Sequence, residues 1–388
     1  MGDFPRITSL KIDGFKVFDK LDVELGPLEV IVGANGSGKS SLFELLKFIR
    51  NGMNQQIPPD IIPGVPFQNI FTKPGIDVFS WSILIGIINE KEYSYEAKIR
   101  GPRGRPEIIS EQGIEYGNNE QGVLDATDAF LGGLEATQED EIDKPGWKPP
   151  RRLLLGHIFH MPGTGYGFDL LRDHITRWSF YSSFNINDNA LRGPVLIQEE
   201  PILEEDGNNL SAVLHYYLTE YPHVIDELIT HLQSVIPGFD TLMVKARGGP
   251  GGVMAFWREE GVDADLTLAD LSDGILRFLC WAVLCLHPKP PTLICIDEPE
   301  LGLHPRVLPL LAGLFQKASQ RTQVLIATHS SYFLSQFPLE SIAVMRKEEG
   351  RAVWKKPADS AALKANLEEF GQDEIEFLHR SNELEERA

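Results

Sequence analysis

Near the amino terminus of this chain stands the stretch Gly33-Ala34-Asn35-Gly36-Ser37-Gly38-Lys39-Ser40, which fits the phosphate-loop pattern G-x-x-x-x-G-K-[ST]. An apolar run at 28–32 leads into it, and residues 41–50 follow with apolar side chains at helical spacing. This order predicts a strand, a loop and a helix, the context in which the pattern has chemical meaning. The alternative is a glycine-rich turn without a ligand, but Lys39 and Ser40 have no packing purpose at the mouth of a helix.

Such a loop predicts a binding site for a nucleotide and its magnesium ion. Glycines let successive N–H groups and the positive end of the following helix point into one concavity that suits a polyphosphate. We expect Lys39 to reach the outer phosphates and Ser40 to ligate Mg²⁺. The residues expected to contact ATP in this segment are Gly33, Ala34, Asn35, Gly36, Ser37, Gly38, Lys39, Ser40 and Ser41.

A pair of carboxylates supplies what the loop lacks. Residues 293–296 form a short apolar run, typical of a strand buried on both faces, and the run ends in Asp297-Glu298. We expect Asp297 to hold Mg²⁺, directly or through water, and Glu298 to polarise the attacking water as a general base. The carboxylates could instead cap a helix, but residues 299–305 are typical of a turn.

A histidine follows the next apolar run. Residues 324–327 are apolar, and Thr328-His329-Ser330 come directly after them. A histidine at a strand end is usually just a satisfied polar group. Here the order of strand, Asp-Glu, helix, strand and histidine favours a γ-phosphate sensor, with the His329 ring on the terminal phosphate or the lytic water.

The segment Leu271-Ser272-Asp273-Gly274 opens a strongly apolar helical stretch that runs from Ile275 to Leu286. Ser272 is typical of a helix N-cap, and Gly274 permits close approach. As an ordinary cap it needs no partner. As a phosphate-binding cap it would present a second helix N-terminus to a nucleotide, and one chain cannot easily fold that helix onto its own Lys39.

These segments together resemble an ABC-type ATPase of the soluble RecF and structural-maintenance-of-chromosomes (SMC) branch. Within that branch the chain is most similar to stand-alone AAA ATPases related to the overcoming-lysogenization-defect (OLD) proteins. The resemblance implies an α/β fold, a P-loop head made of a mixed-sheet lobe and an α/β core, with an inserted helical and β lid subdomain. The matching stretches are 7–18, the phosphate loop, Asp206-Gly207-Asn208-Asn209-Leu210, the serine segment with Arg277, 297–305 and 328–330.

The resemblance also implies a head-to-tail dimer that buries two ATP molecules. Each ATP would be held by Lys39, Ser40, Asp297, Glu298 and His329 of one protomer and by Ser272 and Gly274 of the other. Dimerisation would then depend on ATP, because the γ-phosphate charge lies between two helix N-termini and hydrolysis removes it. The turn 301–304 would lie at the interface.

The chain departs from the family pattern in two places. Asp273 stands where transporter relatives usually carry glycine, and no glutamine follows Gly274, which favours the RecF-like branch over transporters. The glutamine that normally ligates Mg²⁺ from the lobe connection has no clear counterpart. Gln68 is a candidate, and a loop polar residue without a ligand is an equally good interpretation.

Composition points to a cytoplasmic protein without a membrane span. The three cysteines fall in predicted core elements without metal-ligand spacing, and no apolar stretch is long enough to cross a bilayer. A net charge of −20, from 36 basic and 56 acidic residues, does not support nucleic-acid binding. Two basic loops could still bind it, or could be simply solvated; they are Arg100 with Arg103 and Arg105, and Lys144 with Lys148, Arg151 and Arg152.

We expect one catalytic head over residues 1–388, since the motifs at both ends belong to one site. Its predicted parts are a lobe with the phosphate loop (1–100), an inserted helical and hairpin region (101–265), a lobe with the signature, carboxylates and histidine (266–340), and a C-terminal hairpin with an acidic helix (341–388). Predicted details are two strands at 6–32, hairpins at 76–100, 241–257 and 342–354, a loop-rich segment at 101–178, helices at 208–218 and 223–235, and an exposed acidic helix after 367.

Two absences narrow the expected function. No sustained heptads separate Lys39 from Ser272, so the long coiled-coil arms of SMC relatives are not expected. The segment after His329 is too short for the Toprim nuclease domain of OLD proteins. By analogy with relatives in DNA repair and bacterial anti-phage defence, we expect an ATPase whose dimerisation gates a separately encoded effector. The alternatives are a RecF-like DNA-binding repair clamp and, less favoured, the nucleotide-binding subunit of a transporter.

Overall fold

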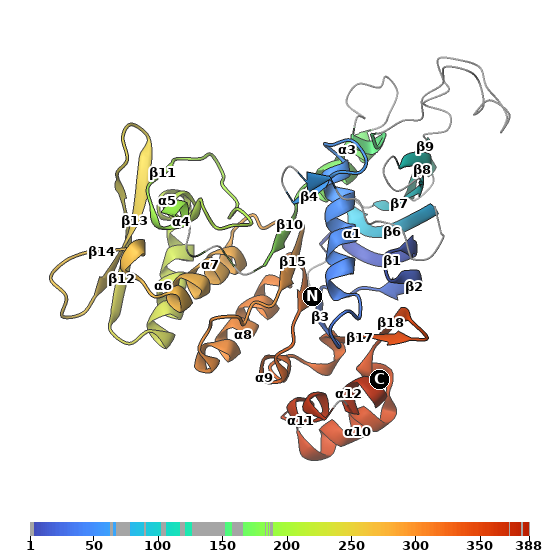
Figure 1. Cartoon of the computed structure of the whole chain (residues 1–388). Helices are drawn as coiled ribbons and strands as arrows, with labels where there is room; N and C mark the ends of the chain where they lie inside the picture. Colours follow the sequence, from blue (N-terminus) through green and yellow to red (C-terminus); the bar gives the residue numbers. More distant parts are fainter. Residues whose placement is uncertain are drawn as a thin grey trace.

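In its described residues the computed structural model has two six-stranded β-sheets and two smaller ones, with helices between and beside the two large sheets (Figure 1). It describes residues 4–62, 65–66, 78–88, 91–101, 106–116, 121–125, 152–156, 166–182, 184, 186, 189–371, 373–381 and 383–387. Within these residues, no helix is long and apolar enough to cross a membrane.

The first sheet is antiparallel and has the strand order β2-β1-β6-β7-β8-β9. One face is buried, as the alternating burial along β7 illustrates, since successive side chains of a strand point to opposite faces. Its strands are β1 (Arg6–Phe15), β2 (Phe18–Glu24), β6 (Val78–Ile88), β7 (Lys91–Arg100), β8 (Glu107–Tyr116) and β9 (Gln121–Asp125). The hairpin expected at 76–100 is confirmed by the β6–β7 pair.

Two predictions for this region are wrong. Residues 6–32 form three strands rather than two, because the chain turns at Lys16, with φ +51°, and not at Gly14, which stays inside β1. Residues 107–116 and 121–125, expected to lie in a loop-rich segment, form β8 and β9. The alternation of β8 is hidden by a buried carboxylate, Glu111, which accepts hydrogen bonds from the Tyr95 hydroxyl and the Leu155 N–H, each 2.9 Å long.

The second sheet carries the strands that position the site. Its order is β10-β15-β16-β3-β17-β18, and all neighbours are parallel except the β17–β18 hairpin, which confirms the hairpin expected at 342–354. Parallel strands end at a common edge, so the residues that follow β3, β15 and β16 lie together there. The strands are β3 (Leu28–Val32), β10 (Trp178–Tyr181), β15 (Leu293–Asp297), β16 (Gln323–Ala327), β17 (Ile342–Glu348) and β18 (Arg351–Lys355).

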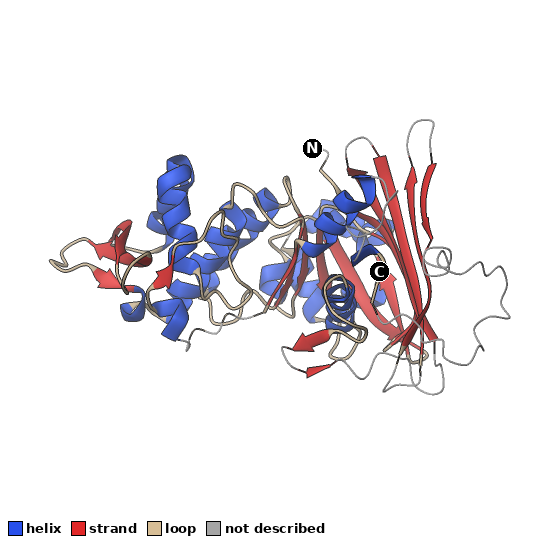
Figure 2. Cartoon of the chain, turned by 90° about the horizontal axis from the view of Figure 1, so that it is seen from above, coloured by secondary structure: helices blue, strands red, loops and turns tan. Residues whose placement is uncertain are grey.

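Each face of this parallel sheet packs against its own hydrophobic core. Ile31, Cys295 and Leu325 face one core, shared with α1 (Lys39–Gly52) and the antiparallel sheet. Val30 and Ile296 face the other core, which the helices α5 to α9 fill. The phosphate-loop helix and the helices of the signature region therefore lie on opposite faces of one sheet (Figure 2).

The second core is built from helices and a small sheet. The helices are α5 (Leu210–Glu220), α6 (Pro222–Val235), α7 (Asp273–Leu286), α8 (Leu308–Ala318) and α9 (Ser331–Leu334), and the strands are β11 (Val195–Leu196), β12 (Phe239–Ala246), β13 (Gly252–Glu259) and β14 (Leu266–Thr267). Helices expected at 208–218 and 223–235 and the hairpin at 241–257 are confirmed. The three cysteines are buried in the core, as expected.

The remaining described elements are short. They are β4 (Asp60–Ile62), β5 (Val65–Pro66), α3 (Tyr166–Thr176), α4 (Asn189–Arg192) and the 3-10 helices η3 (Leu268–Asp270), η4 (Pro305–Val307), η5 (Leu339–Ser341) and η6 (Pro357–Asp359). Residues 101–265 thus contribute β8 to the antiparallel sheet and β10 to the parallel sheet. The boundaries of the insertion stay a prediction.

The acidic C-terminus is not one exposed helix. It forms α10 (Ala361–Phe370), α11 (Glu374–Arg380) and α12 (Glu383–Arg387), with Gly371 at φ +86° ending the first. Ile375, Leu378 and Leu384 are buried in the second core, and α11 packs on α9. The segment folds back onto the rest of the chain because this buries its apolar side chains, which a helix projecting into solvent would leave exposed.

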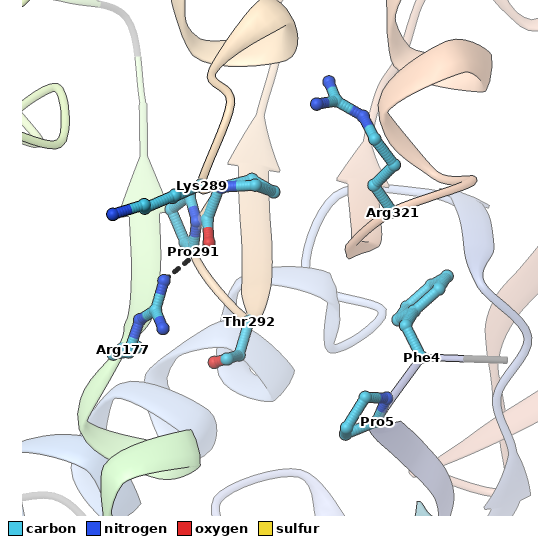
Figure 3. A pocket seen from close by; sticks show the side chains of 8 residues that line it. Phe4, Pro5, Arg177, Lys289, Pro291, Thr292 and Arg321 are labelled. Carbon is cyan, nitrogen blue, oxygen red and sulfur yellow. Dashed lines mark hydrogen bonds between the residues drawn. The ribbon is translucent and has the colours of Figure 1, made fainter. Parts of the chain in front are cut away.

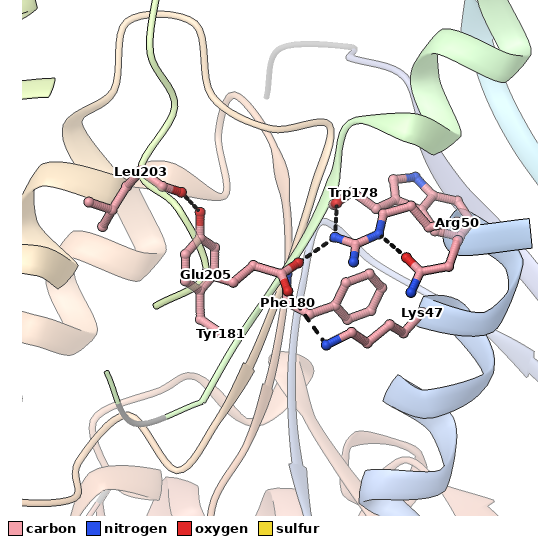
Figure 4. Close-up of polar contacts among 8 residues, drawn as sticks. Lys47, Arg50, Trp178, Phe180, Tyr181, Leu203 and Glu205 are labelled. Carbon is pink, nitrogen blue, oxygen red and sulfur yellow. Dashed lines mark hydrogen bonds and ion pairs between the residues drawn. The ribbon is translucent and has the colours of Figure 1, made fainter. Parts of the chain in front are cut away.

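One polar joint connects α1 to the signature side of the molecule (Figure 4). Glu205 accepts hydrogen bonds from the Arg50 guanidinium and, at 3.1 Å, from the Phe180 N–H, and its carboxylate lies 3.5 Å from the Lys47 ammonium. Asn209 fixes the loop that presents Glu205, since its side chain bonds to the Glu204 N–H at 2.9 Å and to the Ile202 carbonyl at 2.8 Å. Within the segment 206–210, Asn209 therefore has a structural role.

The opposite edge of the parallel sheet carries a small basic hollow. Arg177, Thr292 and Arg321 each precede a core strand and line it (Figure 3). Its arginines are engaged by the protein, since Arg177 donates to the Pro290 carbonyl at 3.0 Å and Arg321 donates to the Cys285 carbonyl at 2.9 Å. The arginines of this hollow therefore stabilise the amino ends of the strands, at the edge of the sheet opposite the phosphate loop.

Glu205→Ala should lower the free energy of unfolding by about 1.5–3 kcal/mol, because it leaves the Phe180 N–H without its acceptor and removes the carboxylate that pairs with Arg50 and Lys47. Urea unfolding followed by tryptophan fluorescence measures the loss. Glu199→Ala, at an exposed carboxylate in the same loop, is the matched control. Equal unfolding midpoints for the two variants would contradict the assigned role of the joint.

Candidate nucleotide-binding site

The phosphate loop joins the fully buried strand β3 to α1, as the sequence predicts. Gly33 has φ +149°, and a Cβ there would lie 1.9 Å from the Met345 carbonyl oxygen of β17. Gly38 has φ +126°, and its Cβ would lie 2.9 Å from the Met345 sulfur. Only glycine fits these positions, so the loop lies directly on β17 and curls back toward the edge of the sheet.

Lys39 is buried inside this loop. Its ammonium donates to the Gly33 carbonyl at 2.6 Å and to the Ala34 carbonyl at 3.4 Å, and the residue is 6% exposed. Burial lowers the pKa of Lys39, while the charges of Glu298, Asp297 and, in α12, Glu385 act in the opposite direction. The cation is thus placed among the carboxylates of the site.

The start of α1 fits a phosphate. Gly38 is the N-cap and provides no side-chain hydrogen bond, and the first hydrogen bond of the helix, from Leu42 to Gly38, is 2.9 Å. The N–H groups of Lys39, Ser40 and Ser41 belong to the first turn, which has no acceptor within its own helix. A helix N-terminus with free donors and a lysine suits an anion with several oxygens.

Asp297 and Glu298 lie at the carboxyl end of β15, beside β16 and one strand from β3. Burial raises the pKa of Asp297, opposed by the charges of Lys39 and His329. Burial, then a hydrogen bond with Glu300 and its charge, raises the pKa of Glu298 to about 8. Glu298 has φ +52°, a conformation that side chains rarely adopt and that is concentrated at functional sites.

His329 completes this edge from the end of β16. Its Nε2 lies 3.7 Å from a Glu298 carboxylate oxygen, and 43% of its side chain is exposed. Burial lowers its pKa, and the charge of Lys39 adds to that effect. The histidine expected as a sensor and the glutamate expected as a base are therefore neighbours.

Glu300 is a residue of this site that the sequence analysis did not single out. Its carboxylate accepts a hydrogen bond from the Thr328 hydroxyl, and Thr328 in turn accepts from the Ser330 N–H at 3.0 Å. Its Oε2 atom is buried and has no hydrogen-bond partner among the described residues. The sequence shows a third carboxylate two positions after Glu298, which could have indicated a role for Glu300. The direction in which the Glu300 side chain points, however, depends on the turn 298–302 and cannot be inferred from the sequence.

Ser272 caps α7, as predicted, with its Oγ accepting from the Ile275 N–H at 3.4 Å. The structure does not bring it to the phosphate loop of its own chain. Within the described part of the chain, no hydrogen bond or ion pair joins Ser272 or Gly274 to residues 33–41. Gly274 stands instead beside the turn after Glu298, since a Cβ on Gly274 would lie 3.0 Å from the Gly302 carbonyl.

The donor set at the sheet edge fits Mg²⁺ held together with a nucleotide. Ser40 and Asp297 offer a hydroxyl and a carboxylate, and Mg²⁺ usually takes one or two protein oxygens beside phosphates and waters. Among the residues that the structure describes, no group of three or more His, Cys, Asp and Glu forms a metal cage. Gln68 lies outside the described residues, as do Arg103, Arg105, Lys144, Lys148 and Arg151 of the basic loops.

Known proteins share this architecture. Residues 169–335 match a family model described as an AAA domain, putative AbiEii toxin, Type IV TA system, and residues 9–145 match a second AAA-domain model. No curated protein matches the sequence.

Two solved structures resemble the whole chain. An SMC head bound to the C-terminal winged-helix domain of ScpA has a TM-score of 0.58 at 15% identity, over 91% of this chain and 99% of that one. An Smc head domain with an extended coiled coil, bound to the C-terminal domain of ScpA derived from Pyrococcus furiosus, has a TM-score of 0.50 at 14% identity, over 94% of this chain and 100% of that one.

Fold and site together define a P-loop protein with the fold of an SMC head. The AAA-domain matches and this fold support an ABC-type, SMC-like ATPase, which confirms the resemblance and the fold class expected from the sequence.

Lys39→Ala should weaken ATP binding about 100-fold or more, because charge-assisted hydrogen bonds to phosphate are worth about 1.5–3 kcal/mol each. Titration with a fluorescent ATP analogue measures the affinity. Lys47→Ala, two turns along the same helix and facing Glu205, is the control and should bind normally. Similar affinities for both variants would remove Lys39 from the site.

Proposed function

We propose that this protein hydrolyses ATP in a composite site shared by two copies of the chain. The N–H groups at the start of α1 and the ammonium of Lys39 hold the phosphates. Glu298 takes a proton from the attacking water, and His329, 3.7 Å away, orients that water or contacts the γ-phosphate. Ser40 and Asp297 would hold Mg²⁺, which neutralises phosphate charge when bound.

The proposal of two copies rests on the separation of the signature from the phosphate loop. Ser272 and Asp273 are exposed at the start of α7, whose side chains pack in the core on the opposite face of the sheet from α1. The turn beside them is exposed as well, with Leu301 51% exposed. A second chain, related by a two-fold axis, could bring its Ser272 and Gly274 to the γ-phosphate of the first.

We further propose that closure and opening of this dimer gate a separately encoded effector, in DNA repair or anti-phage defence. The family description that covers residues 169–335, a putative AbiEii toxin of a Type IV TA system, supports a defence context. The SMC heads with this fold are bound to ScpA domains, which supports the use of such a head as a platform for a partner. The fold allows this role without specifying the partner.

The pH dependence of ATP turnover should follow the ionisation of Glu298. The value of kcat/KM should rise with pH through about 8, because the raised pKa leaves the base protonated, and unable to accept a proton, at lower pH. Glu300→Gln should move this rise to lower pH, since it removes a carboxylate that raises the pKa of Glu298. An unchanged profile in the Glu300 variant would contradict this assignment.

Glu298→Gln should trap an ATP-bound dimer, because it removes the base and keeps the phosphate and Asp297 contacts. Turnover should fall about 100-fold or more, the usual contribution of a general base. Light scattering after gel filtration with ATP measures the size. The proposal fails if this variant with ATP has the same mass as the wild type without nucleotide.

A further inference from the structure

The turn before α7 is held by one arginine. Arg192 in α4 donates from Nη1 to the carbonyls of Leu268, Ala269 and Leu271, at 3.2, 3.1 and 3.1 Å. Its Nη2 donates to the Asp273 carboxylate at 2.7 Å, and its side chain is 18% exposed. These acceptors surround Ser272 on both sides, so one guanidinium fixes the whole approach to the signature helix.

The cap of α7 cannot fix this approach by itself. The Ser272 hydroxyl accepts from the Ile275 N–H at 3.4 Å, which is long for a hydrogen bond. The preceding 3-10 helix η3 is closed by the Thr267–Asp270 capping box, which orders only its own turn. The direction of the Ser272 Oγ therefore depends on how the carbonyls of 268–271 are held, and Arg192 holds three of them.

Asp273 also sets an electrostatic requirement. It is exposed in the first turn of α7, directly beside Ser272. A carboxylate there stabilises the free helix, but its charge opposes the approach of a phosphate to the same N-terminus. The Arg192–Asp273 ion pair offsets that charge, so the helix end can meet an anion.

We propose that Arg192 is a positioning residue that acts in trans: it orders the signature turn and neutralises Asp273 so that Ser272 can meet the γ-phosphate of ATP bound to the partner copy. This inference rests on the proposed composite site. Arg192 lies behind the turn and does not touch the phosphate loop of its own chain within the described residues.

The first test separates binding from turnover. Arg192→Ala should bind ATP as the wild type does, with turnover and ATP-dependent dimerisation reduced at least about tenfold, the size of a lost charge-assisted contact. Arg258→Ala is the matched control, since it removes an Arg–Asp ion pair, with Asp265 at 2.9 Å, from the hairpin of the same side of the molecule. It should keep full turnover. Wild-type turnover in Arg192→Ala would overturn the inference.

The second test locates the defect by mixing inactive variants. A Lys39→Ala chain keeps an intact signature segment, and a Ser272→Arg chain keeps an intact phosphate loop. A mixed dimer of the two therefore contains one complete site, and this mixture is the reference. It should recover about a quarter of wild-type turnover, since half of randomly paired dimers are mixed and each holds one complete site. If this reference pair recovers nothing, the proposed function itself fails.

If the reference pair is active, the inference is tested by mixing Arg192→Ala with each of the two inactive variants in turn. Arg192→Ala should recover turnover when mixed with Lys39→Ala and none when mixed with Ser272→Arg, the behaviour of a signature defect. The reverse pattern, recovery with Ser272→Arg alone, would place the defect in the chain's own phosphate site and overturn the inference.

A further variant guards against misfolding. Arg192→Lys keeps the charge beside Asp273 but cannot reach four acceptors at once, and it should show the same mixing pattern with a smaller loss. Asp273→Asn in the Arg192→Ala background should restore part of the turnover, because it removes the charge left without a partner. No restoration by Asp273→Asn would contradict the electrostatic part of the proposal.

Discussion

The site depends on the placement of one buried cation at the common end of parallel strands. Lys39 follows β3, Asp297 ends β15 and His329 follows β16, so the order of strands in the sheet brings them together. The ammonium is held by the Gly33 carbonyl of its own loop and faces carboxylates that raise its pKa against the effect of burial. A polyphosphate would exchange those carbonyl bonds for stronger, charge-assisted ones.

The parts of this site that the sequence predicts are those encoded in short contiguous patterns. The phosphate loop, Asp297-Glu298, His329 and the Ser272 cap each combine an apolar run with a polar end, and such runs reveal strand ends without any knowledge of packing. The residues that escaped prediction, Glu300 among them, act through contacts between segments distant in the sequence.

The same distinction explains the errors in the fold. β8 was not predicted, because Glu111 interrupts its apolar alternation and is tolerated inside only through hydrogen bonds from Tyr95 and the 154–155 backbone. The charge of the acidic C-terminal segment predicts that it is exposed, yet three of its apolar side chains are buried and α11 packs on α9. As a result, Glu385 of α12 lies close enough to Lys39 for its charge to raise the pKa of that lysine. The local sequence pattern predicts where helices and strands form. Where a charged segment lies, however, depends on the residues from other segments that contact it.

The turn after Glu298 connects the two halves of the proposed mechanism within one chain. The Pro299 carbonyl accepts a hydrogen bond from the Trp281 indole at 3.2 Å, and the Gly302 carbonyl lies against Gly274. In the proposed mechanism Glu298 would serve the ATP of its own chain, whereas α7, which carries Trp281 and Gly274, would serve the ATP of the partner. A shift of the Glu298 backbone must therefore move the signature helix or break its packing, so that each site would respond to the occupancy of the other.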